Sequence, residues 1–96
     1  MNISNNMKVI ELRKNFGSLI ITRKAIIDFF DSLAEFSDGS LILDFEGIEF
    51  ISRSAVHEYL RRKTICGIKV KEINLTQNVK SMFLLVARQM QNAVSV

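Results

Sequence analysis

The sequence predicts an α/β domain in which helices pack on a small mixed sheet of four strands, in the order β-β-α-β-α-β-α. Short β-branched runs alternate along the chain with segments of helical periodicity, which is the pattern of this class. No proline and no Gly/Ser-rich linker interrupts the 96 residues, so we expect a single domain over residues 1–96. Because crossovers through helices are right-handed, the last three strands should be parallel, with the first antiparallel at one end.

The first third of the chain predicts a hairpin and then a helix. Residues 7–12 and 18–21 are apolar and β-branched enough for strands, and residues 13–17 supply turn-forming side chains between them. Thr22 is a candidate N-cap for a helix that ends at residues 37–39. Its apolar residues face inward and its acidic residues outward, namely Ile26, Phe29, Phe30 and Leu33 against Asp28, Asp31 and Glu35.

The middle of the chain predicts a central strand and a second helix. Residues 40–45 form an apolar run typical of a strand covered on both faces, and residues 46–47 turn the chain out of it. A small hydroxyl residue, Ser52 or Ser54, can cap a helix that continues through Lys63. Its expected inner face is Ala55, Val56, Tyr59 and Leu60, and its expected solvated face is Arg53, Arg61, Arg62 and Lys63.

The last third predicts an edge strand and a third helix. Residues 68–73 alternate strictly between apolar and polar side chains, as in a strand with one wetter face. Asn74 or Thr76 can cap the helix that follows. Its core stripe is Val79, Met82, Phe83, Val86, Ala87 and Met90. Leu84 and Leu85 lie off this stripe, and they predict contact with a partner helix or a homodimer contact.

Composition excludes several kinds of protein. One cysteine, Cys66, allows no internal disulfide, and together with the single histidine, His57, it is too little for a zinc site of about four ligands. No basic head precedes an apolar stretch, and no uncharged run is long enough to span a bilayer. We therefore expect a cytoplasmic protein with no membrane association, no metal and no cofactor.

Charge is distributed unevenly along the chain. The formal net charge is +3, but residues 25–50 carry only acidic charges, whereas both flanks are basic. Such segmentation can mark a charged docking face, and the blocks can equally interleave and cancel in the fold.

The residues offer little for catalysis. Ser54 and His57 are one helical turn apart, but a serine at a helix start is a cap by default, and His57 lies among charged residues that we expect to face solvent. Asp44, Glu46 and Glu49 could hold a divalent cation at the strand exit, although such carboxylates more often cap a helix or solvate a loop. The sequence therefore predicts no enzyme and no catalytic residue.

Ser52 and Ser54 are also candidate phosphorylation sites. A phosphate there would add about two negative charges beside unsatisfied backbone N–H groups and beside Arg53. It would reverse the sign of an exposed surface without unfolding the domain. The alternative is a simple N-cap.

The stretch LILDFEGIEFISRSAVHEYL, residues 41–60, resembles the signature of the STAS domain (sulfate transporter and anti-sigma factor antagonist). It is more closely similar to a STAS-like family of unknown function, with which it shares the D-F-x-G-(I/V)-x-F-I-S core and a glutamate in the following helix. Agreement extends to polar positions on three segments and covers residues 8–90. These positions are Arg23, Asp44 and Asn74.

The resemblance implies a regulatory module with helices packed on a small mixed sheet. In the anti-sigma antagonist branch, a histidine-kinase-like ATPase phosphorylates a serine at the start of the second helix, and the phosphate blocks binding of that partner. Ser54 matches this serine. The chain departs from the family at three neighbouring positions. Ser52 stands for an aspartate, Arg53 for a serine and Ala55 for a glycine, which adds a methyl group where a kinase would approach.

The sequence thus predicts a non-enzymatic regulatory protein–protein interaction module, whose partner is a histidine-kinase-like ATPase or a sensor. The expected docking residues are Arg53, His57, Glu58, Arg61 and Arg62. The alternative is a nucleic-acid-binding accessory protein that sets a basic face against phosphates. That face would consist of Arg53, Arg61, Arg62, Lys63, Lys69 and Lys71.

Overall fold

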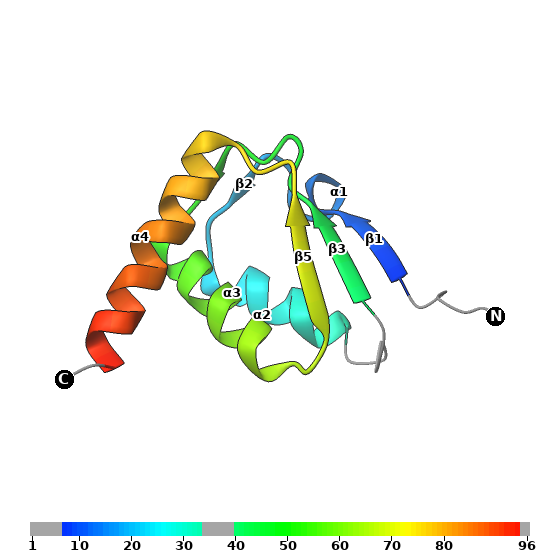
Figure 1. The fold of residues 1–96 in the computed structure, drawn as a ribbon. Coiled ribbons are helices and arrows are strands. Elements are labelled where there is room, and N and C mark those ends of the chain that lie inside the picture. The colour runs from blue at the N-terminus through cyan, green and yellow to red at the C-terminus, as the bar shows by residue number, and fades with distance from the viewer. Residues whose placement is uncertain (1–6, 34–39, 95–96) are drawn as a thin grey trace.

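The computed structural model describes residues 7–33 and 40–94 and has an α/β architecture (Figure 1). Strands and helices alternate along most of the chain. The elements are β1 (Met7–Glu11), α1 (Leu12–Phe16), β2 (Leu19–Ile20), α2 (Arg23–Ser32), β3 (Ser40–Asp44), β4 (Phe50–Ile51), α3 (Arg53–Ile65), β5 (Lys69–Ile73) and α4 (Gln77–Val94).

The described residues form two small sheets rather than one sheet of four strands. One sheet has the order β1-β3-β5, and the other pairs β2 with β4. All of these pairs are parallel, with Val9 opposite Ile42 and Ile42 opposite Lys71 in the first sheet. Within the second, Leu19 is opposite Phe50. The prediction of an α/β class is confirmed, and so is the placement of residues 68–73 at an edge, because β5 is an outer strand. The predicted mixed sheet is wrong, because every strand pair among the described residues is parallel.

The predicted N-terminal hairpin is wrong. Residues 12–16 form the short helix α1, with Leu12 buried, and Gly17 leaves this helix with a positive φ of 75°. The helix separates β1 from β2, so the two strands enter different sheets and β1 lies parallel to β3 instead of antiparallel at one end. The reason is that Leu12 belongs to the buried core, and this burial outweighs the turn propensity of the residues after it.

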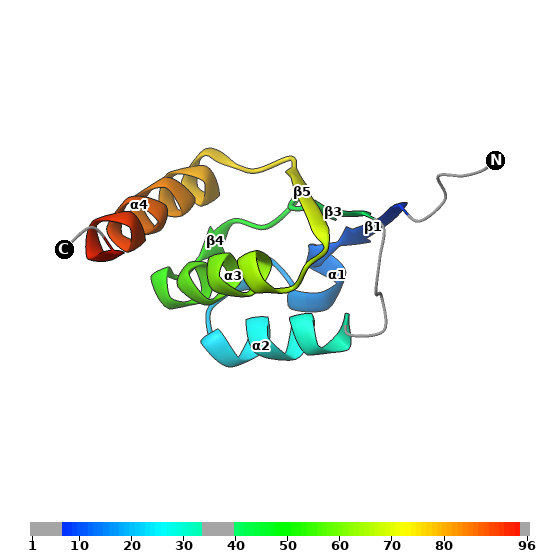
Figure 2. The same cartoon turned by 60° about the horizontal axis from the view of Figure 1, so that its bottom comes forward.

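The helices α2 and α3 pack against each other on one side of the β1-β3-β5 sheet, and α4 packs on α3 and β4 (Figure 2). Within β3, Leu41 and Leu43 are buried, whereas the alternate residues Ser40, Ile42 and Asp44 are half-buried. The expectation of a strand covered on both faces is therefore wrong. Helices cover one face of this sheet.

Tyr59 is the centre of the core. Its ring lies 5.7 Å from that of Phe30 on α2, 6.3 Å from that of Phe45 after β3 and 5.3 Å from that of Phe83 on α4. The Tyr59 side chain thus connects α3 to α2, to the segment after β3 and to α4. Its hydroxyl donates a hydrogen bond to the Glu72 carboxylate on β5.

The predicted helix faces are largely confirmed. The four apolar residues expected inside α2 are buried, and Thr22 caps this helix by accepting a hydrogen bond from the Ala25 N–H at 3.1 Å. Thr76, rather than Asn74, caps α4, because its hydroxyl accepts from the Val79 N–H at 3.3 Å. Ala87 is exposed, so its assignment to the core stripe is wrong. Glu35 and residues 37–39 lie outside the described residues.

Candidate functional site

The segment Ser52-Arg53-Ser54 lies at the N-terminus of α3, directly after β4. Ser52 is the N-cap: its Oγ accepts from the Ala55 N–H at 3.1 Å and donates to the carbonyl of Ile21. The Oγ of Ser54 lies 3.4 Å from that of Ser52. The Ser52 hydroxyl therefore holds the start of α3 against the end of β2, which leaves Ser54 with the less engaged hydroxyl.

Both serines line an open hollow of about 490 Å³ at this end of α3. Arg53 and His57 of α3 line it too, as do Arg23 at the start of α2 and residues of α4. Arg53 is exposed, and none of the described acidic residues forms an ion pair with it. The hollow therefore combines two hydroxyl groups with cationic side chains, and solvent reaches it. The α4 residues are Val86 and Gln89.

Among the described residues, Glu58 is the charged residue that is buried, and 2% of its surface is exposed. Its carboxylate accepts from Arg23 Nη1 at 3.1 Å, Arg61 Nη2 at 3.2 Å and Arg62 Nε at 3.3 Å. Burial by itself would raise the pKa of Glu58, but the hydrogen bonds from Arg23, Arg61 and Arg62 outweigh it and leave that pKa below its usual value. The cluster joins α2 to α3.

The contacts of this cluster give several of the predicted docking residues a structural role instead. Glu58 was expected to contact a partner, but it is buried and instead positions the arginines around it. Arg62, expected to be solvated, is half-buried and also reaches Asp31 at 3.3 Å. Lys63 is half-buried as well and pairs with Glu72 at 2.7 Å. Arg53 and His57 are the expected docking residues that line the hollow.

Sequence reasoning overlooked the burial of Glu58, although a signal was present. Arg61 and Arg62 follow Glu58 by one helical turn, which is the spacing of an ion pair on one helix face. Glu58 also stands beside Tyr59 and one turn after Ala55, both of which were expected inside. A glutamate between core positions, with arginines three and four residues later in the same helix, indicates a buried carboxylate that pairs with those arginines.

A second polar group lies at the carboxyl ends of the parallel strands. The Asp44 carboxylate accepts from Asn74 Nδ2 at 2.9 Å and from the Glu46 N–H at 2.9 Å. These bonds, that from Asn74 first, hold the pKa of Asp44 below its usual value. The resemblance had marked Arg23, Asp44 and Asn74, and the structure gives each of them a polar partner that stabilises the fold.

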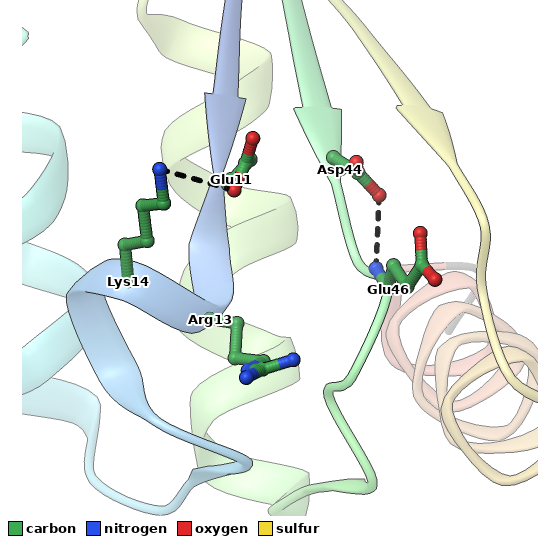
Figure 3. Close-up of a pocket in the computed structure, with 5 residues that line it drawn as sticks. All are labelled: Glu11, Arg13, Lys14, Asp44 and Glu46. Carbon is green, nitrogen blue, oxygen red and sulfur yellow. Dashed lines mark hydrogen bonds and ion pairs between the residues drawn. The ribbon is translucent and has the colours of Figure 1, made fainter.

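Around Asp44 lies a hollow of about 290 Å³, lined by charged side chains of both signs (Figure 3). Glu11 and Lys14 pair there at 3.4 Å, and Asp44 points to the backbone of Glu46. Within residues 7–33 and 40–94, no group of three or more His, Cys, Asp or Glu side chains is placed to hold a metal ion. The remaining lining residue is Arg13.

Gly47 packs against Arg13, one of the residues that line this hollow, and substitution of Gly47 tests that contact. It has a φ of +84°, and a Cβ at this position would meet the side chain of Arg13, whereas Gly67, with a φ of +77°, has open space. Gly67→Ala should lower the free energy of unfolding by about 1 kcal/mol through backbone strain, and Gly47→Ala by about 1 kcal/mol more. Urea unfolding measures both. Equal costs would contradict the Arg13 contact, and Arg13→Ala should remove the difference.

In the part of the chain that the structure describes, no helix is both long and apolar enough to cross a membrane. Comparison of the chain with protein-family models, with curated proteins and with solved structures gave no match. The STAS-like resemblance of residues 41–60 therefore stays a prediction.

Proposed function

We propose that this chain is a non-enzymatic regulatory module of STAS-like type that docks a protein partner through the N-terminus of α3. The observation that carries the proposal is the position of Ser54. It lines an open hollow beside Arg53, which is exposed and has no ion-pair partner among the described residues. A partner that contacts this hollow would sense the charge at Ser54. Phosphorylation of that serine would then control docking.

Ser54 is the better phosphate acceptor of the two serines. The Ser52 hydroxyl both caps α3 and bonds Ile21, so a phosphate on it would break two contacts at the start of the helix. Ser54 has no such structural role among the described residues. Its hydroxyl has a hydrogen-bonding contact there with that of Ser52. A phosphate on Ser54 would lie at the positive end of α3, near Arg53, where the charge of about −2 is stabilised.

The geometry gives little support to nucleophilic catalysis at this site. A serine nucleophile needs a histidine held in place by an acid. The Nδ1 of His57 lies 3.5 Å from Arg23 Nη1, and the neighbouring Glu58 carboxylate is occupied by arginines. These contacts favour a binding role for the hollow.

Charge pairing also favours a protein partner over nucleic acid. Arg61 and Arg62 are paired with Glu58, and Lys63 is paired with Glu72, so three of the six residues of the predicted basic face already contact a carboxylate. Contacts to several phosphates would make binding fall steeply as salt rises. We expect instead a shallow salt dependence of partner binding.

Incubation with a histidine-kinase-like ATPase from the same organism and ATP, followed by mass spectrometry, tests the proposal. We expect one phosphate on the wild-type protein and on Ser52→Asn, which keeps a capping side chain, but none on Ser54→Ala. Ser54→Asp should weaken binding of the ATPase by about tenfold or more, because it places a negative charge in the docking surface. Phosphate on Ser54→Ala, or full binding by Ser54→Asp, would contradict the assignment.

A further inference from the structure

The outer face of α4 carries exposed leucines. The inner face of this helix is fixed by Val79 and Val86, which are buried and lie two turns apart. On the opposite side Leu84 is 63% exposed, and Leu85, about 100° further round the helix, is 39% exposed. Figures 1 and 2 show α4 at the periphery of the fold, so that its outer side meets no other described element. Exposed leucines on a helix that already has a packed face indicate a second contact surface.

Basic side chains bracket these leucines. Lys80, Leu84 and Arg88 follow each other at intervals of about one helical turn, so they form a row along α4. No acidic residue occurs between Gln77 and Val94, and neither Lys80 nor Arg88 pairs with a described acidic residue. The α4 face, defined as Lys80, Leu84, Leu85 and Arg88, is therefore apolar in the middle and positive at both ends.

We propose that the α4 face docks an amphipathic helix of a partner protein whose apolar stripe is flanked by acidic residues. Leucines of the two helices would bury each other, and carboxylates of the partner would lie against Lys80 and Arg88. The charge pattern complements such a helix at both ends. It also sets the register, because the two cations are about two turns apart.

A second copy of this chain fits the α4 face less well. An antiparallel pair of α4 helices would place Lys80 opposite Arg88 of the other copy, and a parallel pair would place each cation opposite itself. No acidic residue on α4 offsets this repulsion. A lipid surface also fits less well, since two basic residues contribute only about 1 kcal/mol each at an anionic membrane.

The α4 face adjoins the hollow at the start of α3. Leu85 and Gln89 lie one turn apart on α4, and Gln89 lines that hollow. The partner that docks at Ser54 could therefore lie along α4 as well. The α4 proposal does not depend on phosphorylation, and Ser54 variants leave the α4 face unchanged, so the two proposals fail separately.

Titration of the ¹⁵N-labelled protein with two synthetic peptides tests the proposal by NMR. Each peptide is an amphipathic helix of about 18 residues with a leucine stripe, flanked by glutamates in one and by lysines in the other. We expect the glutamate peptide to bind about tenfold more tightly or better and to shift the amide signals of residues 80–88. Equal binding of both peptides, absence of binding, or shifts elsewhere would overturn the proposal.

Variants of the α4 face sharpen the test. Leu84→Ser with Leu85→Ser should weaken binding of the glutamate peptide by about tenfold. Ile65→Ser, which changes an equally exposed residue (64%) on α3, should leave it unchanged. Lys80→Glu with Arg88→Glu should reverse the preference and favour the lysine peptide. Circular dichroism establishes that each variant is folded. Unchanged preference after charge reversal would overturn the proposal.

Two further measurements test whether a second copy of this chain or a membrane occupies the α4 face. Light scattering should give a monomeric mass, and vesicles of phosphatidylserine and phosphatidylcholine should not bind. A dimer that Leu84→Ser dissolves would assign the α4 face to a second copy. Vesicle binding that Leu84→Ser removes would assign it to a membrane. Either result would overturn the proposal.

Discussion

Tyr59→Ala is expected to lower the free energy of unfolding by about 3–5 kcal/mol and to leave much of the protein unfolded at room temperature. Tyr59 is 2% exposed, and its ring contacts Phe30 on α2, Phe45 after β3 and Phe83 on α4. Removing the ring opens a cavity where these segments meet. The α4 helix should loosen first, because Phe83 packs its middle turns against Phe45 and Tyr59.

Tyr59→Phe is the matched control for this prediction. It keeps the ring and removes only the hydrogen bond to Glu72, so it should cost about 1 kcal/mol. Urea unfolding gives the free energies, and amide hydrogen exchange of α4 reports local opening. If Tyr59→Ala proved as stable as Tyr59→Phe, the central place of Tyr59 in the core would be refuted.

Glu58→Gln is expected to cost about 2–3 kcal/mol of unfolding free energy. The glutamine cannot balance the guanidinium groups of Arg23, Arg61 and Arg62, which converge on this position. The control is Asp28→Asn, which neutralises a carboxylate that pairs with Lys24 at 2.9 Å on the surface. An exposed pair contributes little, so the control should cost less than about 0.5 kcal/mol. Equal costs for the two variants would contradict the role of Glu58.

The same carboxylate predicts a pH dependence. Because folding lowers the pKa of Glu58 below its ordinary value of 4.5, the wild type gains stability from it above that pH. This contribution should be lost as the pH falls through the lower pKa of the folded state. The stability difference between wild type and Glu58→Gln should therefore be constant from about pH 7 to 5 and shrink in more acidic solution. A difference that grew below pH 4.5 would contradict the sign.

The long periodic segments of the fold were predictable, and its short elements were not. The helices α2, α3 and α4 followed from apolar spacing and hydroxyl caps, and Thr22, Ser52 and Thr76 cap them in the structure. The strands β2 and β4 are two residues each, too short for a pattern, and they pair across 31 positions of the sequence. No local signal reveals such a partnership.

The candidate site was predictable in its position but not in its chemistry. Ser52, Arg53 and Ser54 lie at the N-terminus of α3, as the sequence indicated. Their neighbours across the hollow, Arg23 and Gln89, come from distant parts of the chain, and only the folded structure brings them there. The positions of Arg23 and Gln89 beside the hollow depend on the tertiary packing of α2 and α4 on α3.

Site-specific photo-crosslinking in cells of the source organism tests the central claim most directly. A benzophenone side chain at position 89, where Gln89 lines the hollow from α4, should give a discrete crosslinked protein, and Ser54→Asp in the same chain should remove it. The same side chain at position 65, at the other end of α3, should not give this product. If position 89 gave no crosslink, or the same products as position 65, the hollow at the start of α3 would not be a docking surface.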